Sequence, residues 1–136
     1  MRYMADESPC TCTTLRRLTR MVTTAYDETM KPSGLRVTQF SVLRTLARLG
    51  PLSVTRLAAE AGLDRSTMGR NLDPLEREGF VRITVGEADH RERVATLTEA
   101  GEEAIVQATP FWDAAQREMA RRISPSTINM LVRQLQ

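Results

Sequence analysis

The chain is poor in the residues from which most metal centres and disulfide scaffolds are built. It has a single histidine, His90, which excludes a histidine-rich metal site, and nothing else in the composition indicates a cofactor. Its two cysteines, Cys10 and Cys12, are too few and too close together for a disulfide framework. Aromatic residues make up only 4% of the chain, so its core must consist of aliphatic side chains and methionine. That composition favours helices over a β-sandwich or barrel.

Long apolar runs are absent as well. No stretch approaches the roughly 18 residues that indicate a membrane-spanning helix. The first eight residues lack the apolar core and the small-residue cleavage site of a secretory leader. We therefore expect a cytoplasmic protein that has no membrane partner and is located in a reducing compartment.

A strong excess of positive charge is also missing. The net charge is +2, and the segment from Asp64 to Arg93 contains six arginines against seven acidic residues. The usual electrostatic mark of a nucleic-acid-binding surface is therefore weak in this chain. If the chain binds DNA, the placement of individual arginines must explain it.

The chain does contain a succession of helical patterns with clear boundaries. Apolar residues recur at three- and four-residue steps from about residue 10 to 30, which predicts an amphipathic helix. Thr38 is the expected N-cap of a second helix, which ends at Gly50-Pro51 because proline cannot continue it. Thr98 is expected to cap a long helix, and Ser124-Pro125 to begin a short final one.

Two short helices separated by a tight turn are predicted in the middle of the chain. Ser53 begins the first, and Gly62 forms the turn after it. Asp64 then caps a helix that continues to about Glu78. Two short helices that cross steeply over such a turn are typical of a DNA-binding helix-turn-helix.

The spacing of the apolar residues changes after this pair of helices. Residues 81–85 alternate between apolar and polar, residues 86–92 form a polar loop, and residues 94–97 form the expected return strand. Helices followed by a two-stranded ribbon match a winged helix. One helix of such a fold enters the major groove, and the ribbon is available for the neighbouring minor groove.

Five polar side chains lie in the first two turns of the helix that Asp64 caps, largely away from its apolar stripe. Arginine binds guanine in a bidentate manner, asparagine binds adenine, and serine and threonine bind several partners. The candidates are Arg65, Ser66, Thr67, Arg70 and Asn71. In an isolated helix a solvated polar face would be the simpler explanation, but the helix-turn-helix context favours DNA reading. Gly69, in the middle of this helix, indicates close approach to DNA or a tight contact with another helix.

The loop between the two predicted strands carries Asp89 and Arg91. An aspartate can hold a neighbouring arginine in one rotamer, so that the guanidinium is placed in advance for a narrow, electronegative minor groove. A solvated surface pair is the alternative. The position of the pair between two strands that follow a recognition helix favours the DNA contact.

Three short motifs together resemble the signature of the MarR family of bacterial transcription regulators. They are Gly79-Phe80-Val81, Asp89-x-Arg91 and Leu97-Thr98-Glu99-x-Gly101. Leu63-Asp64-Arg65-Ser66-Thr67, followed by Arg70-Asn71-Leu72, is similar to the recognition helix of this family. The resemblance implies a mainly α-helical protein with a small β-wing, in which residues 1–136 form a single winged helix-turn-helix domain.

The resemblance also implies a dimer. The DNA-binding lobe would comprise residues 37–97, and residues 10–31 and 98–136 would form the dimerisation helices. Apolar stripes on the helices near both ends support this independently, because the compact middle segment cannot cover them all. The partner would be a double-stranded, near-palindromic operator. By analogy, the five polar residues would face the major groove and Arg91 the minor groove.

The function expected from the resemblance is transcriptional repression rather than enzymatic catalysis. The common mode of regulation in the family is release of the operator by a small phenolic or aromatic ligand, bound between the dimer lobe and the winged helix. Trp112, Phe40 and Tyr26 are weakly specified candidates for its lining, since each can equally be a core residue. A winged helix used only for protein contacts is a third hypothesis.

A thiol-based oxidant sensor is the alternative regulatory hypothesis. Cys12-x-x-Leu15, with Tyr26 on the same helix, partly resembles the organic-hydroperoxide-sensing branch of the family, although Arg16 stands where that branch has a tyrosine. A thiolate near a helix N-terminus is stabilised by the helix dipole, and Arg16 would add to this effect. The redox candidates are thus Cys12, Cys10 and Tyr26. The other interpretations are two small residues at the start of a helix, of which one or both are buried, metal binding by the pair, and a small thiol enzyme using Cys12.

Overall fold

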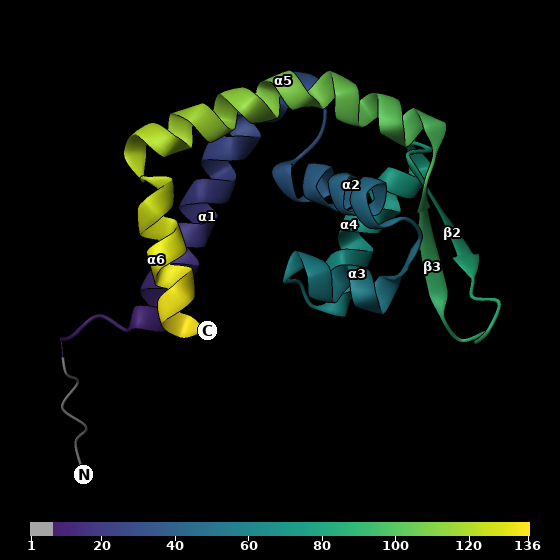
Figure 1. Ribbon diagram of the computed structural model, residues 1–136, viewed down its shortest axis with the longest axis horizontal. Helices are drawn as coiled ribbons and strands as arrows, with labels where there is room; N and C mark the ends of the chain where they lie inside the picture. The colour runs from purple at the N-terminus through teal and green to yellow at the C-terminus, as the bar shows by residue number, and fades with distance from the viewer. Residues whose placement is uncertain (1–6) are drawn as a thin grey trace, which may run out of the picture.

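A computed structural model describes residues 7–136 (Figure 1). The described chain consists of helices and a small three-stranded antiparallel sheet, which confirms the predicted fold class. Its elements are α1 (Thr11–Met30), the 3-10 helix η1 (Lys31–Ser33), α2 (Val37–Leu49), β1 (Leu52–Ser53), α3 (Val54–Ala61), α4 (Arg65–Arg77), β2 (Val81–Val85), β3 (Arg93–Leu97), α5 (Glu99–Arg122) and α6 (Pro125–Leu135).

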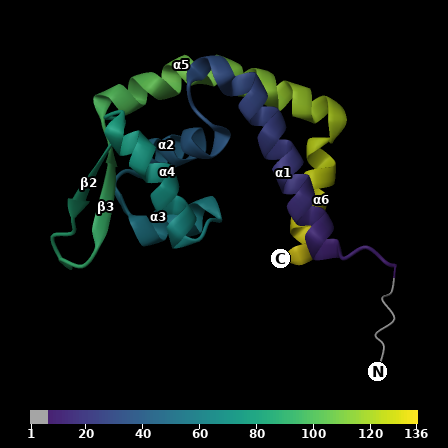
Figure 2. The ribbon, with the colours of Figure 1, turned by 180° about the vertical axis from the view of Figure 1, so that it is seen from behind.

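The long helix α5 connects two lobes. In Figures 1 and 2, α2, α3, α4 and the sheet lie beneath its N-terminal half, and we call this group the winged-helix lobe. The helices α1 and α6 lie beneath its C-terminal half. We call α1, α6 and the C-terminal half of α5 the outer lobe. The domain boundaries expected from the sequence stay a prediction, because α5 belongs to both lobes.

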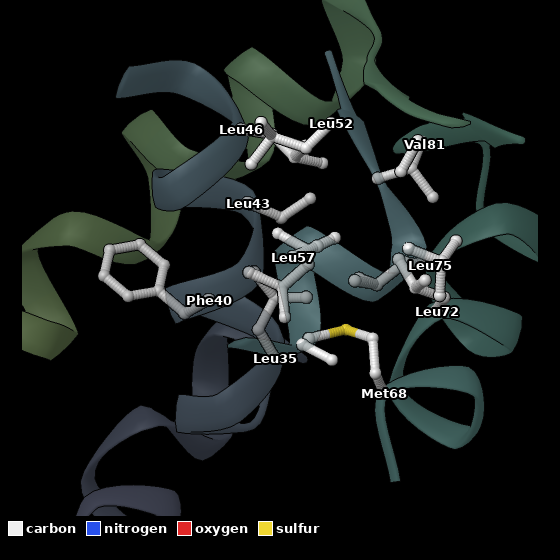
Figure 3. Close-up of a cluster of buried hydrophobic side chains, with 14 of the residues drawn as sticks. Leu35, Phe40, Leu43, Leu46, Leu52, Leu57, Met68, Leu72, Leu75 and Val81 are labelled. Carbon is white, nitrogen blue, oxygen red and sulfur yellow. The ribbon is translucent and has the colours of Figure 1, made fainter. Parts of the chain in front are cut away.

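The core of the protein lies in the winged-helix lobe. Figure 3 shows side chains of α2, α3 and α4 meeting there, among them Phe40, Leu43, Leu57 and Met68, which are all fully buried. Removing a side chain of this size from water stabilises the fold by about 1.5–3 kcal/mol. The core therefore holds α4 against α2 and α3.

Local capping signals predicted most of the helix boundaries correctly. The side chains of Ser53, Asp64, Thr98 and Ser124 each accept a hydrogen bond from the backbone N–H three residues further along. Gly62 adopts a left-handed conformation with φ of 66°, which makes the tight turn between α3 and α4. These boundaries place the first turn of α4 at the surface of the lobe.

The expected N-cap at Thr38 is wrong by two residues. α2 begins at Val37, with Arg36 in the cap position. The Asp27 carboxylate, which projects from α1, accepts a hydrogen bond from the Val37 N–H at 2.8 Å and takes over the capping role. Thr38 lies inside the helix, where its hydroxyl is free to bond elsewhere. The Gln39 side chain also accepts a hydrogen bond from the Arg36 N–H at 3.0 Å, which is a local signal for this helix start, whereas the contribution of Asp27 comes from another helix.

The sheet has one strand more than the sequence predicted. β1 consists of only two residues and pairs antiparallel with β3, through Leu52 opposite Ala95 and Ser53 opposite Val94. β2 pairs with β3 along five residues on the other side, so the strand order is β1-β3-β2. Because β1 runs directly into α3, this pairing ties the N-terminus of α3 to the base of the wing.

Within residues 7–136, no helix is both long enough and apolar enough to cross a membrane. The expectation that the chain carries no secretory leader rests on its first eight residues. Six of those lie outside the part of the chain that the structure describes.

Candidate nucleic-acid interface

The first two turns of α4 present three polar side chains to solvent. Arg65, Ser66 and Arg70 are exposed. The first turn is held by Asp64, whose carboxylate accepts hydrogen bonds from the backbone N–H and the hydroxyl of Thr67 at 2.8 and 2.9 Å. These two bonds, together with the charge of Arg70, lower the pKa of the Asp64 carboxyl. The cap is therefore ionised at neutral pH, and the exposed side chains project from a well-ordered helix end.

Two of the five predicted DNA-reading residues form hydrogen bonds within the protein through their polar side-chain atoms. The Thr67 hydroxyl lies between Asp64 and the guanidinium of Arg70, which donates to it at 3.2 Å. Asn71 is half-buried, and its amide oxygen accepts from the Thr38 hydroxyl while its amide nitrogen donates to the Thr67 carbonyl, both at 2.9 Å. A bidentate contact with adenine needs both ends of the amide. Both ends of the Asn71 amide already bond within the protein, which restricts the directions in which it can contact a base.

The glycine within α4 does not serve a tight helix contact. A Cβ atom built on Gly69 would meet nothing within 4 Å. Gly69 lines a hollow of about 130 Å³ whose other walls come from α3, α4 and the sheet. Of the two explanations offered by the sequence, packing against another helix is therefore wrong within this chain, and close approach of DNA stays a prediction.

The wing carries Arg91 in the arrangement that the sequence predicted. The Asp89 carboxylate accepts a hydrogen bond from the Arg91 backbone N–H at 3.0 Å and contacts its Nε at 3.4 Å. The Arg91 side chain is nevertheless 93% exposed. An exposed ion pair of this kind contributes little to stability, so its main effect is to restrict the directions in which the guanidinium can point.

A polar hollow of about 380 Å³ separates the first turn of α4 from the wing. Arg65 and Arg91 line it, and so do two groups that the sequence did not single out, Arg93 and the first turn of α3 at Val54 and Thr55. The first backbone N–H groups of a helix have no acceptor within the helix. The carboxylates of Asp89 and Glu92 complete the wall. The sequence did contain a signal for Arg93, because this residue follows Arg91 by two positions on the same ribbon.

The two cysteines lie at the exposed N-terminus of α1. Cys10 is the N-cap residue, and hydrogen bonds from the side chain and backbone of Thr13 and from the backbone of Cys12 lower the pKa of its thiol. The Arg16 guanidinium contacts the Cys12 sulfur at 3.6 Å, as expected from their spacing. The interpretation of the cysteines as buried structural residues is wrong, because both are exposed.

Tyr26 is not part of the cysteine group within one chain. At the helical rise of about 1.5 Å per residue, it lies about 21 Å along α1 from Cys12. Its hydroxyl donates a hydrogen bond to the Gln116 side chain of α5, and partial burial raises the pKa of this phenol. Tyr26 therefore ties α1 to α5. Among the described residues, no group of three or more acidic, cysteine or histidine side chains is arranged to hold a metal ion.

The aromatic candidates lie where α2 meets α5. The rings of Phe40 and Trp112 are 5.7 Å apart, and the Arg44 guanidinium lies 4.2 Å from the centre of the Trp112 ring. Phe40 is fully buried and belongs to the core, whereas Trp112 is half-buried at its edge. The aromatic and cationic groups thus form one cluster between the two helices.

The model of the MarR family matches residues 35–92, which span the winged-helix lobe through the wing tip. The transcriptional regulator MosR of M. tuberculosis, solved in complex with DNA, is 34% identical to this chain, with 93% of each chain covered and a TM-score of 0.81. The chain belongs to the MarR family.

Other MarR-like structures share the architecture over nearly the whole chain. CouR of Rhodococcus jostii RHA1, solved with p-coumaroyl-CoA, is 28% identical, covers 96% of this chain and 94% of its own, and has a TM-score of 0.74. BpsR of Bordetella bronchiseptica, whose DNA binding is regulated by 6-hydroxynicotinic acid, is 22% identical, with 98% and 95% covered and a TM-score of 0.79. At that identity BpsR shows the fold alone. This MarR-family protein is a DNA-binding transcription regulator with a winged helix.

Proposed function

We propose that this MarR-family protein is a homodimeric repressor of transcription that binds a near-palindromic operator through α4 and the wing of each subunit. The observation that carries the proposal is the placement of exposed Arg65, Ser66 and Arg70 on the first turns of α4, with the oriented Arg91 on the neighbouring wing. The three side chains of α4 suit base edges in the major groove, and Arg91 suits a narrow minor groove. We propose the bacterial cytoplasm as its compartment, because its DNA target lies there.

The polar hollow between α4 and the wing supports simultaneous binding of α4 and the wing to one duplex. A DNA strand separates the major groove from the minor groove, so its phosphates must pass between α4 and the wing. Arg65, Arg93 and the N-terminal turn of α3 converge at that place. Arginines and a helix N-terminus both stabilise a phosphate. The hollow is therefore suited to hold the backbone in register while base edges are read.

The dimer is supported by the outer lobe. α6 has no buried residue within its own chain, although one of its faces is apolar. Burial of this face against a second copy would remove it from water and would bring two α4 helices onto one operator. Two half-sites about one duplex turn apart, roughly 34 Å, then account for a near-palindromic target.

The test of this function is binding to the DNA upstream of the protein's own gene, measured by fluorescence anisotropy between about 50 and 200 mM salt. We expect saturable binding that is stronger than binding to scrambled DNA of the same length. The affinity should fall steeply with salt, because each neutralised phosphate contributes a slope of about −0.9 in the logarithmic plot. Equal binding to both DNAs, or no binding at the lowest salt, would overturn the proposed operator.

Replacing Arg91 with alanine should weaken operator binding about tenfold, which corresponds to about 1.4 kcal/mol. The change removes the guanidinium that Asp89 orients and leaves the core untouched, so the thermal midpoint should stay the same. The matched control is Arg48→Ala in the last turn of α2, which removes the same charge from an exposed site outside α4 and the wing. If the two variants bind the operator equally well, Arg91 does not contact DNA.

We further propose that a small phenolic or aromatic ligand releases the operator. The cluster of Phe40, Trp112 and Arg44 supports this, since it offers aromatic faces and a cation at the junction of the two lobes. CouR, which has been solved with an aromatic thioester, has the same fold. A ligand bound at this junction would act by changing the distance between the two α4 helices.

An organic hydroperoxide is the second candidate inducer, and the exposed, acidified thiol of Cys10 beside Cys12 favours it. The thiolate would attack the terminal peroxide oxygen, so that the O–O bond breaks, the sulfur is oxidised to a sulfenic acid and an alcohol leaves. Because the pKa of Cys10 is lowered, more of its thiol is ionised at neutral pH than in an ordinary cysteine.

Operator release by cumene hydroperoxide or by p-coumarate distinguishes the two inducers. For the thiol mechanism we expect hydroperoxide to release the wild-type protein but not the double variant Cys10→Ser/Cys12→Ser. The single variants Cys12→Ser and Cys10→Ser then identify the reacting thiol, because only loss of that thiol abolishes release. For the ligand mechanism p-coumarate should release all four proteins equally. Hydroperoxide that releases the double variant as well as the wild type would contradict the thiol switch.

We propose a regulator and not an enzyme. Sensing consumes one hydroperoxide for each oxidised thiol, whereas a thiol peroxidase consumes many. Measuring hydroperoxide loss in the presence of dithiothreitol therefore separates the two. Sustained turnover that disappears in Cys12→Ser would contradict the proposal.

A further inference from the structure

A run of hydrogen bonds joins the outer lobe to α4 through the N-terminus of α2. The Asp27 carboxylate of α1 accepts from the Val37 N–H at 2.8 Å. One residue further along, the Thr38 hydroxyl donates to the amide oxygen of Asn71 at 2.9 Å. The amide nitrogen of Asn71 then donates to the Thr67 carbonyl at 2.9 Å. Asp27, Thr38, Thr67 and Asn71 are all half-buried.

The chemistry of the partners fixes the direction of these bonds. The Thr67 carbonyl can only accept, so the amide nitrogen of Asn71 must face it and the amide oxygen must face Thr38. Both polar ends of Asn71 are thus satisfied inside the protein. Removing the Thr38 hydroxyl would leave the amide oxygen without a partner, which is costly at a half-buried position. The arrangement favours one orientation of α4 relative to α2.

We propose that Thr38 and Asn71 are positioning residues that set the orientation of α4 on DNA, and that Asp27 links this contact to α1. The inference rests on the proposed function and assigns Asn71 a different role from base reading. Thr67 is also bound to Asp64 and Arg70, so the run of bonds ends at the first turn of α4. A shift of α1 that moves the first turn of α2 must either carry α4 with it or break the Thr38–Asn71 bond.

The first experiment compares Thr38→Val, which keeps the shape and removes the hydroxyl, with Thr38→Ser, which keeps the hydroxyl. We expect Thr38→Val to lower operator affinity about tenfold and Thr38→Ser to bind like the wild type. The salt slope should be the same in all three proteins, since Thr38 contacts no phosphate. Wild-type affinity in Thr38→Val, or equal loss in both variants, would overturn the positioning role.

The second experiment separates positioning from base reading. Asn71→Ala and Thr38→Val are measured singly and together against operators in which each base pair is changed in turn. If the two residues act as one unit, the double variant should bind no worse than Asn71→Ala, and no single base pair should lose its preference. Additive losses, with relaxed preference at one base pair in Asn71→Ala only, would assign Asn71 to base reading and overturn the proposal.

Hydrogen exchange without DNA tests the contact independently of the operator. Thr38→Val should accelerate amide exchange in α4 and leave the outer-lobe helices unchanged, whereas Thr38→Ser should restore slow exchange. Asp27→Ala should accelerate exchange in the first turn of α2 and also in α4, with Asp27→Asn as the variant that keeps an acceptor. If Asp27→Ala accelerates exchange in α2 but not in α4, then α1 has no part in positioning α4. If wild-type protein shows no operator binding but these exchange effects appear, the proposed function fails while the positioning contact stands.

Discussion

Gly101→Ala is expected to lower the free energy of unfolding by about 3 kcal/mol, equivalent to a thermal midpoint about 10 °C lower. A Cβ atom at this position would lie 2.2 Å from the Phe80 carbonyl oxygen and 2.5 Å from a methyl group of Leu97. The oxygen cannot easily move, because it accepts a hydrogen bond from the Thr98 N–H at 3.1 Å. The first turn of α5 must therefore separate from the end of the α4–β2 connection.

Thermal unfolding followed by circular dichroism measures this effect, and Gly69→Ala is its matched control. Gly69 also lies within a helix, but an added Cβ there meets nothing within 4 Å. Alanine is the better helix former, so Gly69→Ala should be stabilising by about 0.5–1 kcal/mol. A Gly101→Ala midpoint within about 1 °C of the wild type would contradict the close approach, because a change of that size corresponds to a few tenths of a kcal/mol.

Leu131→Glu in α6 is expected to convert the proposed dimer to a monomer and to weaken operator binding more than 100-fold, since a monomer holds only one half-site. Five apolar side chains of α6 are between 43% and 83% exposed within one chain. They are Ile128, Met130, Leu131, Val132 and Leu135. In α1, Leu15, Leu18 and Met21 are exposed as well. Burying such a set in two copies contributes on the order of 10 kcal/mol before the cost of association.

Size-exclusion chromatography with light scattering measures the mass, and fluorescence anisotropy measures the operator affinity. The control is Val106→Glu, which places the same charge on an apolar residue that is 71% exposed on α5 outside the outer lobe. This variant should remain dimeric. A Leu131→Glu protein that keeps the mass of a dimer would show that the subunits meet through a surface other than α6.

Much of the winged-helix lobe was predictable because its signals are local. Ser53, Asp64 and Thr98 each cap a helix through a bond to the third residue along, so each boundary depends on neighbouring side chains only. The strand β2 was recognisable from its alternation, since Val81 and Ile83 on one of its faces meet the core, whereas Val85 at its end is exposed. The Asp89–Arg91 pair was equally accessible, because its partners are two positions apart.

The errors at Thr38 and β1 share one physical cause, which is that the deciding partner is distant in the sequence. Asp27 caps α2 from another helix, and β1 becomes a strand only because β3 supplies its hydrogen bonds. The same applies to the hollow between α4 and the wing, where Arg65 and Arg93 meet. No local pattern encodes such pairs, since they form only when the packed core brings the segments together.

By itself, the sequence determined where α3, α4, α5 and α6 begin, the order of helix, turn, helix and wing, and which polar residues enter the first turns of α4. These properties depend on contacts between residues a few positions apart. Only the tertiary structure decided how those polar residues are used. Of the five, Arg65, Ser66 and Arg70 point outward, whereas Thr67 and Asn71 bond within the protein. Asn71 does so because packing of α2 against α4 places Thr38 beside it, 33 positions away in the chain.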